Sequence, residues 1–126
     1  MPMRDGMRGL TVIVADRSSE RLRAALTLAA AQAALGGRAR LFCQGEAAAM
    51  LRPPIEGEGD EAHDRAGLPM LAELVEEALT LGVELIACQS GLALTGIDAT
   101  TFDPRVGAGG PVGVLQSLGD DRLVVI

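Results

Sequence analysis

The sequence predicts a single-domain α/β protein: a three-layer α/β/α arrangement with a mostly parallel sheet of four or five strands. Short apolar runs alternate along the chain with helix-capable segments, and the two longest of these segments have more than ten residues. Parallel strands joined by right-handed crossovers place helices on both faces of one sheet. The 126 residues suit one domain with a buried core.

The first half of the chain indicates two strands and two helices. The strands are short, apolar and partly β-branched, and the longer helix places leucine and alanine at i, i+4 and i+7. A serine at position 18 or 19 is a suitable N-cap, and Gly36 and Gly37 supply the stop. The predicted bounds are 10–15 and 38–43 for the strands, and 19–35 and 44–51 for the helices.

Residues 53–67 open with two prolines and continue as an acidic, glycine-punctuated segment. Such a composition favours solvent, so we predict a mobile acidic loop on the surface. The spacing of its acidic residues does not match the Asp-x-Asp-x-Asp-Gly pattern of a calcium-binding loop. His63 is the only histidine of the chain, which excludes a histidine-rich metal site. We therefore predict no metal site.

The second half of the chain indicates two strands and three helical segments. A glycine follows the first two helical segments, and Pro111 suits the first position of the third. Residues 1–9 are an N-terminal extension, and 97–109 are a connection. The predicted helical segments are 68–81, 89–95 and 110–118, and the strands are 83–87 and 122–126.

Composition argues against several partners. The net charge is -6, the eleven basic residues are all arginine without a cluster, and Trp and Tyr are absent, so nucleic acid is not expected. No run approaches the roughly 18 apolar residues of a membrane span, and no secretory signal opens the chain. We expect a cytoplasmic protein, and its lack of lysine suggests a GC-rich bacterial genome.

The two cysteines, Cys43 and Cys88, are too few for a disulfide framework, so their reactivity is the question. Cys88 follows an apolar strand, and ligands of parallel sheets gather at the carboxyl ends of strands. The turn at Gln89, Ser90 and Gly91 offers free backbone N–H groups that favour a thiolate. The small Ser90 and Gly91 also leave room for an added sulfur atom.

Both cysteines have a plainer interpretation. Cys88 is equally explained as a small buried hydrophobe at the end of a core strand. Cys43 also ends a strand, so it is a candidate second thiol that resolves an oxidised or persulfidated Cys88. A buried strand residue without chemistry is the alternative for Cys43.

The segment 85–97, with Cys88 before a short helix that closes in Gly96-Ile97, resembles the DsrE/DsrF-like family. The preceding residues 78–83, the first strands and helix, Gly109-Gly110 and the closing strand fit that family as well. In this family the third residue after the cysteine is most often serine and the next methionine. Here Gly91 and Leu92 stand at those places, which puts a hydrogen-bonding role there in doubt.

The resemblance implies that Cys88 accepts sulfane sulfur as a persulfide from a donor protein and passes it to an acceptor protein. It also implies a homo-oligomer, a trimer or hexamer, and no cofactor. Whether the chain is an enzyme stays open. The alternative is a non-catalytic oligomeric module that binds a small molecule or a protein, with Cys88 lining the pocket. A nucleotide-binding enzyme ranks lowest, because the glycines at 107–110 lack a phosphate-binding motif.

Overall fold

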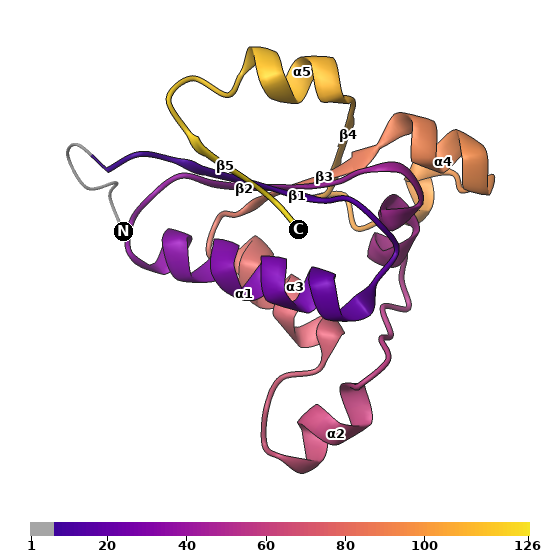
Figure 1. The fold of residues 1–126 in the computed structure, drawn as a ribbon. Helices are drawn as coiled ribbons and strands as arrows, with labels where there is room; N and C mark the ends of the chain where they lie inside the picture. The colour runs from indigo at the N-terminus through magenta and orange to yellow at the C-terminus, as the bar shows by residue number, and fades with distance from the viewer. Residues whose placement is uncertain (1–6) are drawn as a thin grey trace.

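The computed structural model describes residues 7–126, and it contains one sheet of five parallel strands in the order β4-β3-β2-β1-β5 (Figure 1). Residues 1–6 of the predicted N-terminal extension lie outside the described residues. The strands are β1 (Leu10–Val14), β2 (Ala39–Cys43), β3 (Glu84–Cys88), β4 (Gly107–Gly109) and β5 (Arg122–Val125). The helices are α1 (Ser19–Ala34), η1 (Gly45–Leu51), α2 (Asp60–Arg65), α3 (Leu71–Thr80), α4 (Gln89–Thr95), η2 (Ala99–Thr101) and α5 (Pro111–Gln116).

The fold class predicted from the sequence is confirmed. Helices α1 and α3 cover one face of the sheet, and α5 lies over the other, which makes three layers (Figure 1). The predicted caps of α1 are present, since the Ser18 side chain accepts a hydrogen bond from the Arg21 N–H. Gly36 ends the helix with a φ of 86°, a left-handed conformation that glycine adopts without steric cost.

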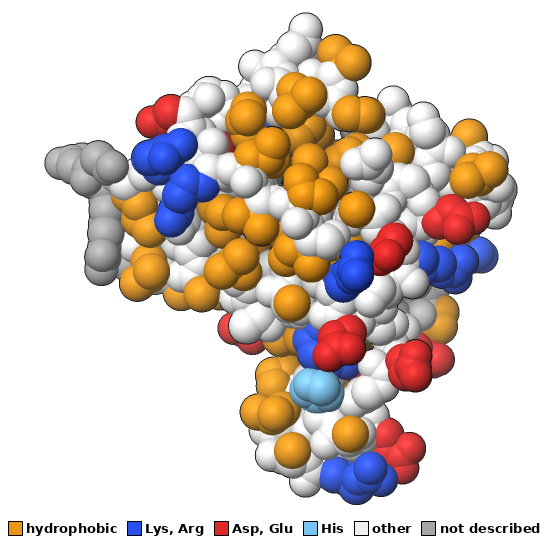
Figure 2. Space-filling model, viewed as in Figure 1, with side chains coloured by type: hydrophobic (Ala, Val, Ile, Leu, Met, Phe, Trp, Pro, Cys, Tyr) orange, Lys and Arg blue, Asp and Glu red, His pale blue; other side chains and the backbone are white. Residues whose placement is uncertain are grey.

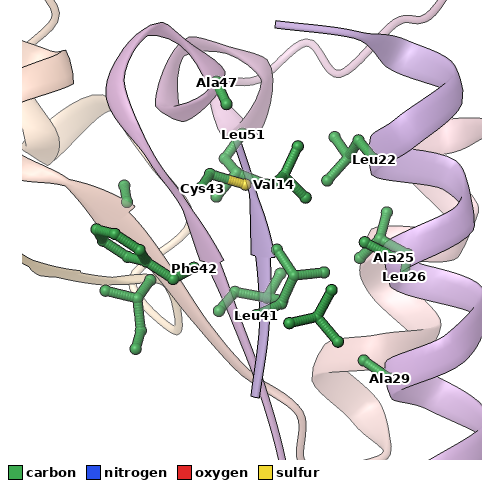
Figure 3. Packing of buried hydrophobic residues seen from close by; sticks show 14 of the residues in the cluster. Val14, Leu22, Ala25, Leu26, Ala29, Leu41, Phe42, Cys43, Ala47 and Leu51 are labelled. Atoms are coloured by element: carbon green, nitrogen blue, oxygen red, sulfur yellow. The ribbon is translucent and has the colours of Figure 1, made fainter. Parts of the chain in front are cut away.

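The main core lies between the sheet and α1. Val14, Leu41 and Cys43 point from the strands towards Leu22 and the other buried residues of α1, whereas Phe42 points to the opposite face (Figure 3). The leucines of this layer are fully buried, and truncating one to alanine costs roughly 2–5 kcal/mol in such a core. This layer therefore carries much of the stability.

The opposite face of the sheet has a thinner cover. Helix α5 has six residues, of which only Val114 is buried. Its polar anchor is Arg40, a buried residue in the middle of β2. The Arg40 guanidinium donates hydrogen bonds to the Val114 carbonyl (3.1 Å), to Ser117 Oγ (2.6 Å) and to Thr11 Oγ1 (3.0 Å).

A carboxylate completes this buried polar cluster. Thr11 Oγ1 donates a hydrogen bond to Asp121 Oδ2 at 2.9 Å, and Arg40 Nε lies 3.8 Å from the same oxygen. A buried arginine without partners would be strongly destabilising, and these contacts together offset the cost of burying Arg40. The cluster joins β1, β2, α5 and the turn before β5.

Two segments differ from the prediction. Strand β4 forms within 97–109, which was predicted as a connection, because Gly107, Ala108 and Gly109 pair with the free edge of β3. The segment 53–67 was predicted as a loop, but it contains helix α2. The prediction that this segment is exposed is correct, since none of the residues of α2 is buried.

Asp60 fixes the start of α2 to the rest of the protein. Its carboxylate accepts hydrogen bonds from Arg23 Nη2 (2.7 Å), from the Leu71 N–H (2.9 Å) and from the Gly57 N–H (2.9 Å). Burial raises the pKa of Asp60, but these hydrogen bonds and the Arg23 charge together outweigh it, so the net effect is a lowered pKa. The anchor thus contributes stability above the ordinary aspartate pKa of about 4 and loses it as the pH falls through the folded-state value.

We therefore predict that Asp60→Asn increases amide hydrogen exchange in residues 55–70 at pH 7 by at least about tenfold, because charge-assisted hydrogen bonds are lost. Hydrogen exchange with mass spectrometry, corrected for intrinsic rates, checks this. The wild type should show the same local opening only when the pH falls below about 4. Asp64→Asn, an exposed change on the same helix, is the control, and equal exchange in both variants would contradict the assignment.

Candidate functional site

Cys88 is the last residue of β3 and the N-cap of α4, at the carboxyl edge of the sheet. β3 is an inner strand with β2 on one side and β4 on the other, and Cys88 pairs with Gly109. The Cys88 residue is 3% exposed. The predicted strand-end position is therefore present, but the thiol is covered in the single chain.

The register of the sheet separates the two cysteines. Cys43 lies opposite Ala87, not opposite Cys88. Side chains alternate between the faces along a strand, so Cys88 points to the face opposite that of Ala87 and Cys43. Cys43 faces α1 (Figure 3). By this alternation Cys88 faces the other side of the sheet, over which α5 lies. The structure does not bring these two thiols together, which weighs against the resolving role considered for Cys43.

The apolar surroundings of Cys43 make its thiol unreactive. Its side chain lies among Val14, Leu22 and Leu51 with no exposed surface (Figure 3). Burial raises the pKa of the Cys43 thiol to about 12, because the apolar environment disfavours the thiolate. Cys43 is thus a protonated core residue at neutral pH.

The three residues predicted to form the site with Cys88 differ in their burial. Gln89 and Ser90 are exposed in the first turn of α4. Gly91 is buried, and a Cβ atom there would collide with the carbonyl oxygen of Gly45 in η1. Gly91 therefore allows two backbones to approach closely, which explains why serine is absent at this position. The small size of Gly91 therefore serves the packing of α4 against η1.

Two hollows lie near this edge of the sheet. One of about 560 Å³ is lined by Arg17, Arg52 and Glu56, among others, beyond the ends of β1 and η1. Another of about 170 Å³ lies between α5 and the sheet, where Arg40, Ile86 and residues 107–110 form its wall. Cys88 is outside its lining, one step further along the same face of β3 than Ile86.

The described residues provide no metal centre. Among residues 7–126, no three potential ligands of the His, Cys, Asp and Glu types converge. His63 lies in α2, where its Nδ1 atom is 2.8 Å from the Gly59 carbonyl. In the same part of the chain, no helix has both the length and the apolarity to cross a bilayer.

Sequence reasoning missed the Arg40 cluster. An arginine between Ala39 and Leu41 suggests an exposed position on an amphipathic strand. The available signal was the predicted second layer of helices, because a sheet covered on both faces must bury such a residue and give it partners. Asp121, in a segment predicted only as a turn, is the buried partner.

Fold and site together define a small α/β protein whose parallel sheet presents a cysteine at the end of an inner strand. The crystal structure of the YchN protein from E. coli shares this architecture, with a TM-score of 0.68 and 22% sequence identity over 95% of this chain and all of that chain. YchN has the DsrE-like fold, so the family resemblance is supported at the level of the fold. No protein-family model and no curated protein sequence matches the chain.

We predict that Gly91→Ala destabilises the protein by about 3 kcal/mol, because the new methyl group forces α4 away from η1. Urea unfolding measures the difference. The matched control is Gly113→Ala in α5, where a Cβ atom meets nothing within 4 Å. That change should leave stability unchanged or raise it by up to about 1 kcal/mol. Equal effects of the two alanines would refute the close approach.

Proposed function

We propose that the protein is a sulfur carrier in which Cys88 accepts sulfane sulfur as a persulfide and passes it to a partner protein. The observation that carries the proposal is the place of Cys88, at the carboxyl end of an inner strand and the start of a helix. The DsrE-like fold supports the proposal without establishing the activity. Cys43 is excluded as the carrier by its depth in the core and its raised pKa.

The proposed chemistry is two successive exchanges at sulfur. The Cys88 thiolate attacks the outer sulfur of a donor persulfide, an S–S bond forms on Cys88, and the donor leaves as a thiolate. An acceptor thiolate then attacks the outer sulfur of the Cys88 persulfide and releases the Cys88 thiolate. Sulfane sulfur is passed on without net oxidation, so these steps require no cofactor.

The burial of Cys88 favours a second candidate function. At 3% exposure, the residue is also suited to lining the wall of a binding module without reacting. The hollow under α5 and the larger hollow near Arg17 are the candidate binding places of such a module, although Cys88 is not among the residues that line them. The two functions differ in one respect, since only sulfur transfer depends on the Cys88 thiol itself.

We also propose that the chain forms a homo-oligomer, a trimer or hexamer, through a surface that we name the β5-edge surface. It comprises Leu28 on α1 and Leu123 and Val125 on β5, all substantially exposed. Hydrophobic side chains gather over α1 and β5 in Figure 2. A second copy of the chain suits this place, because an apolar surface beside a free strand edge is unfavourable in water.

The sulfur-carrier proposal predicts that incubation with glutathione persulfide adds 32 Da to the Cys88 peptide in mass spectrometry (the mass of one sulfur atom). Cys88→Ser should abolish the adduct, because the attacking sulfur is gone. Cys43→Ala, the matched control, should load as the wild type does. If Cys88 reacts with iodoacetamide but takes up no sulfur, the carrier function fails and the binding module is favoured.

The assembly proposal predicts a mass of more than one chain in light scattering at micromolar concentration. Val125→Asp should reduce it to the mass of one chain, because a charge at the β5-edge surface opposes burial. Leu94→Asp is the control, since Leu94 is at least as exposed as Val125 but lies on α4, outside this surface. A wild type that is monomeric, or a Val125→Asp variant that stays assembled, would contradict the proposal.

A further inference from the structure

The hollow of about 560 Å³ near Arg17, which we name the Arg17–Arg52 hollow, lies beyond the carboxyl end of β1. Ligands of open parallel sheets bind at this edge. Three segments of the chain form its wall: the start of α1, the end of η1 with the residues after it, and Ile97 after α4. The end of β1, the start of α1 and the turns of η1 come together at one end of the sheet in Figure 1. The volume of the hollow suits a small organic molecule.

The two arginines of this hollow differ from the other arginines of the described chain. Ten arginines fall within residues 7–126, and eight of them donate a side-chain hydrogen bond to a protein oxygen. Arg17 and Arg52 have no such partner within these residues, and both line the same hollow. A guanidinium binds an oxyanion through two parallel N–H···O hydrogen bonds. Two guanidinium groups with free N–H donors in one wall therefore favour an anionic ligand.

The charge of the wall indicates which anion fits. Among the described residues that line the hollow, Glu56 is the one acid, so the two arginines leave a net charge of +1. Ser19 adds a hydroxyl group that can donate a further hydrogen bond. A carboxylate carries a single negative charge, whereas a phosphate monoester carries about 1.5 to 2 at neutral pH. The wall therefore balances a carboxylate better than a phosphate.

The rest of the wall is apolar. Met50 and Ile97 pack against the core from partly buried positions, and Ala49 beside them is buried. Pro53 and Pro54 complete the wall, and their rings restrict φ, which limits the backbone freedom of this segment. An organic carboxylate thus finds partners for its charge and an apolar surface for its carbon skeleton in one place.

We infer that the Arg17–Arg52 hollow is a binding site for a small organic carboxylate. The carboxylate group pairs with Arg17 and Arg52, and the apolar part of the ligand lies against Met50 and Ile97. Cys88 is not among the residues that line this site. The inference therefore goes beyond sulfur carriage and does not rest on it, because binding here involves no reaction at sulfur.

Fluorine NMR of the intact protein tests the site with para-fluorobenzoate and with para-fluorobenzamide, which has the same ring but no charge. We expect the acid to bind at least about tenfold more tightly than the amide, because only the acid accepts charge-assisted hydrogen bonds. Arg17→Gln and Arg52→Gln should each weaken binding of para-fluorobenzoate about tenfold. Arg65→Gln is the matched control, since it removes the same charge from an exposed position of α2 outside the hollow.

Glu56→Gln provides a test of opposite sign. It should tighten binding of para-fluorobenzoate by about threefold, because a like charge in the wall is removed. Glu77→Gln, an exposed change on α3 outside the hollow, should have no effect. The midpoint of urea unfolding should be the same in all these variants, because surface substitutions of this kind leave stability nearly unchanged. Weaker binding then reports the site rather than unfolding.

Three results would overturn the site: equal binding of the acid and the amide, no binding of para-fluorobenzoate at millimolar concentration, or unchanged binding in both arginine variants. Tighter binding of para-fluorophenyl phosphate than of para-fluorobenzoate would reject the choice of a carboxylate. A sulfur adduct on Cys88 without carboxylate binding would leave sulfur carriage standing and reject this site. Carboxylate binding without a sulfur adduct would do the reverse.

Discussion

The packing of α1 against one face of the parallel sheet is the interaction on which the rest of the structure depends. Large side chains of β1 and β2 meet Leu22 and Leu26 of α1 there, with no exposed surface. Within residues 7–126 the opposite face has a thinner cover, to which α5 contributes one buried side chain. The sheet is thus firmly covered on one side and lightly covered on the other.

This unequal cover gives the two cysteines different properties. Cys43 lies on the firmly covered face, where burial keeps it protonated. Cys88 lies one strand away on the lightly covered face, at the edge where parallel sheets gather ligands. The alternation of side chains along β2 and β3 decides this difference, since Cys43 is paired with Ala87. A shift of one residue in that register would place both thiols on one face.

Elements with strong local signals could be predicted from the sequence. Features that depend on contacts between residues far apart in the chain could not. The α1 cap at Ser18, the stop at Gly36 and Pro111 at the start of α5 are local, and all three are present. Strand β4 has a Gly-Ala-Gly sequence without strand preference and forms because β3 offers an edge. The roles of Gly91 and Arg40 depend on Gly45, Asp121 and Ser117, which lie far away in the sequence.

Native-state hydrogen exchange by NMR tests the central claim, unequal cover of the two faces, most directly. The account predicts that amides of α5, such as those of Val114 and Ser117, exchange through local opening at least about a hundredfold faster than those around Leu26 of α1, after correction for intrinsic rates. Equal protection of α5 and α1, with exchange of both through global unfolding only, would contradict the account.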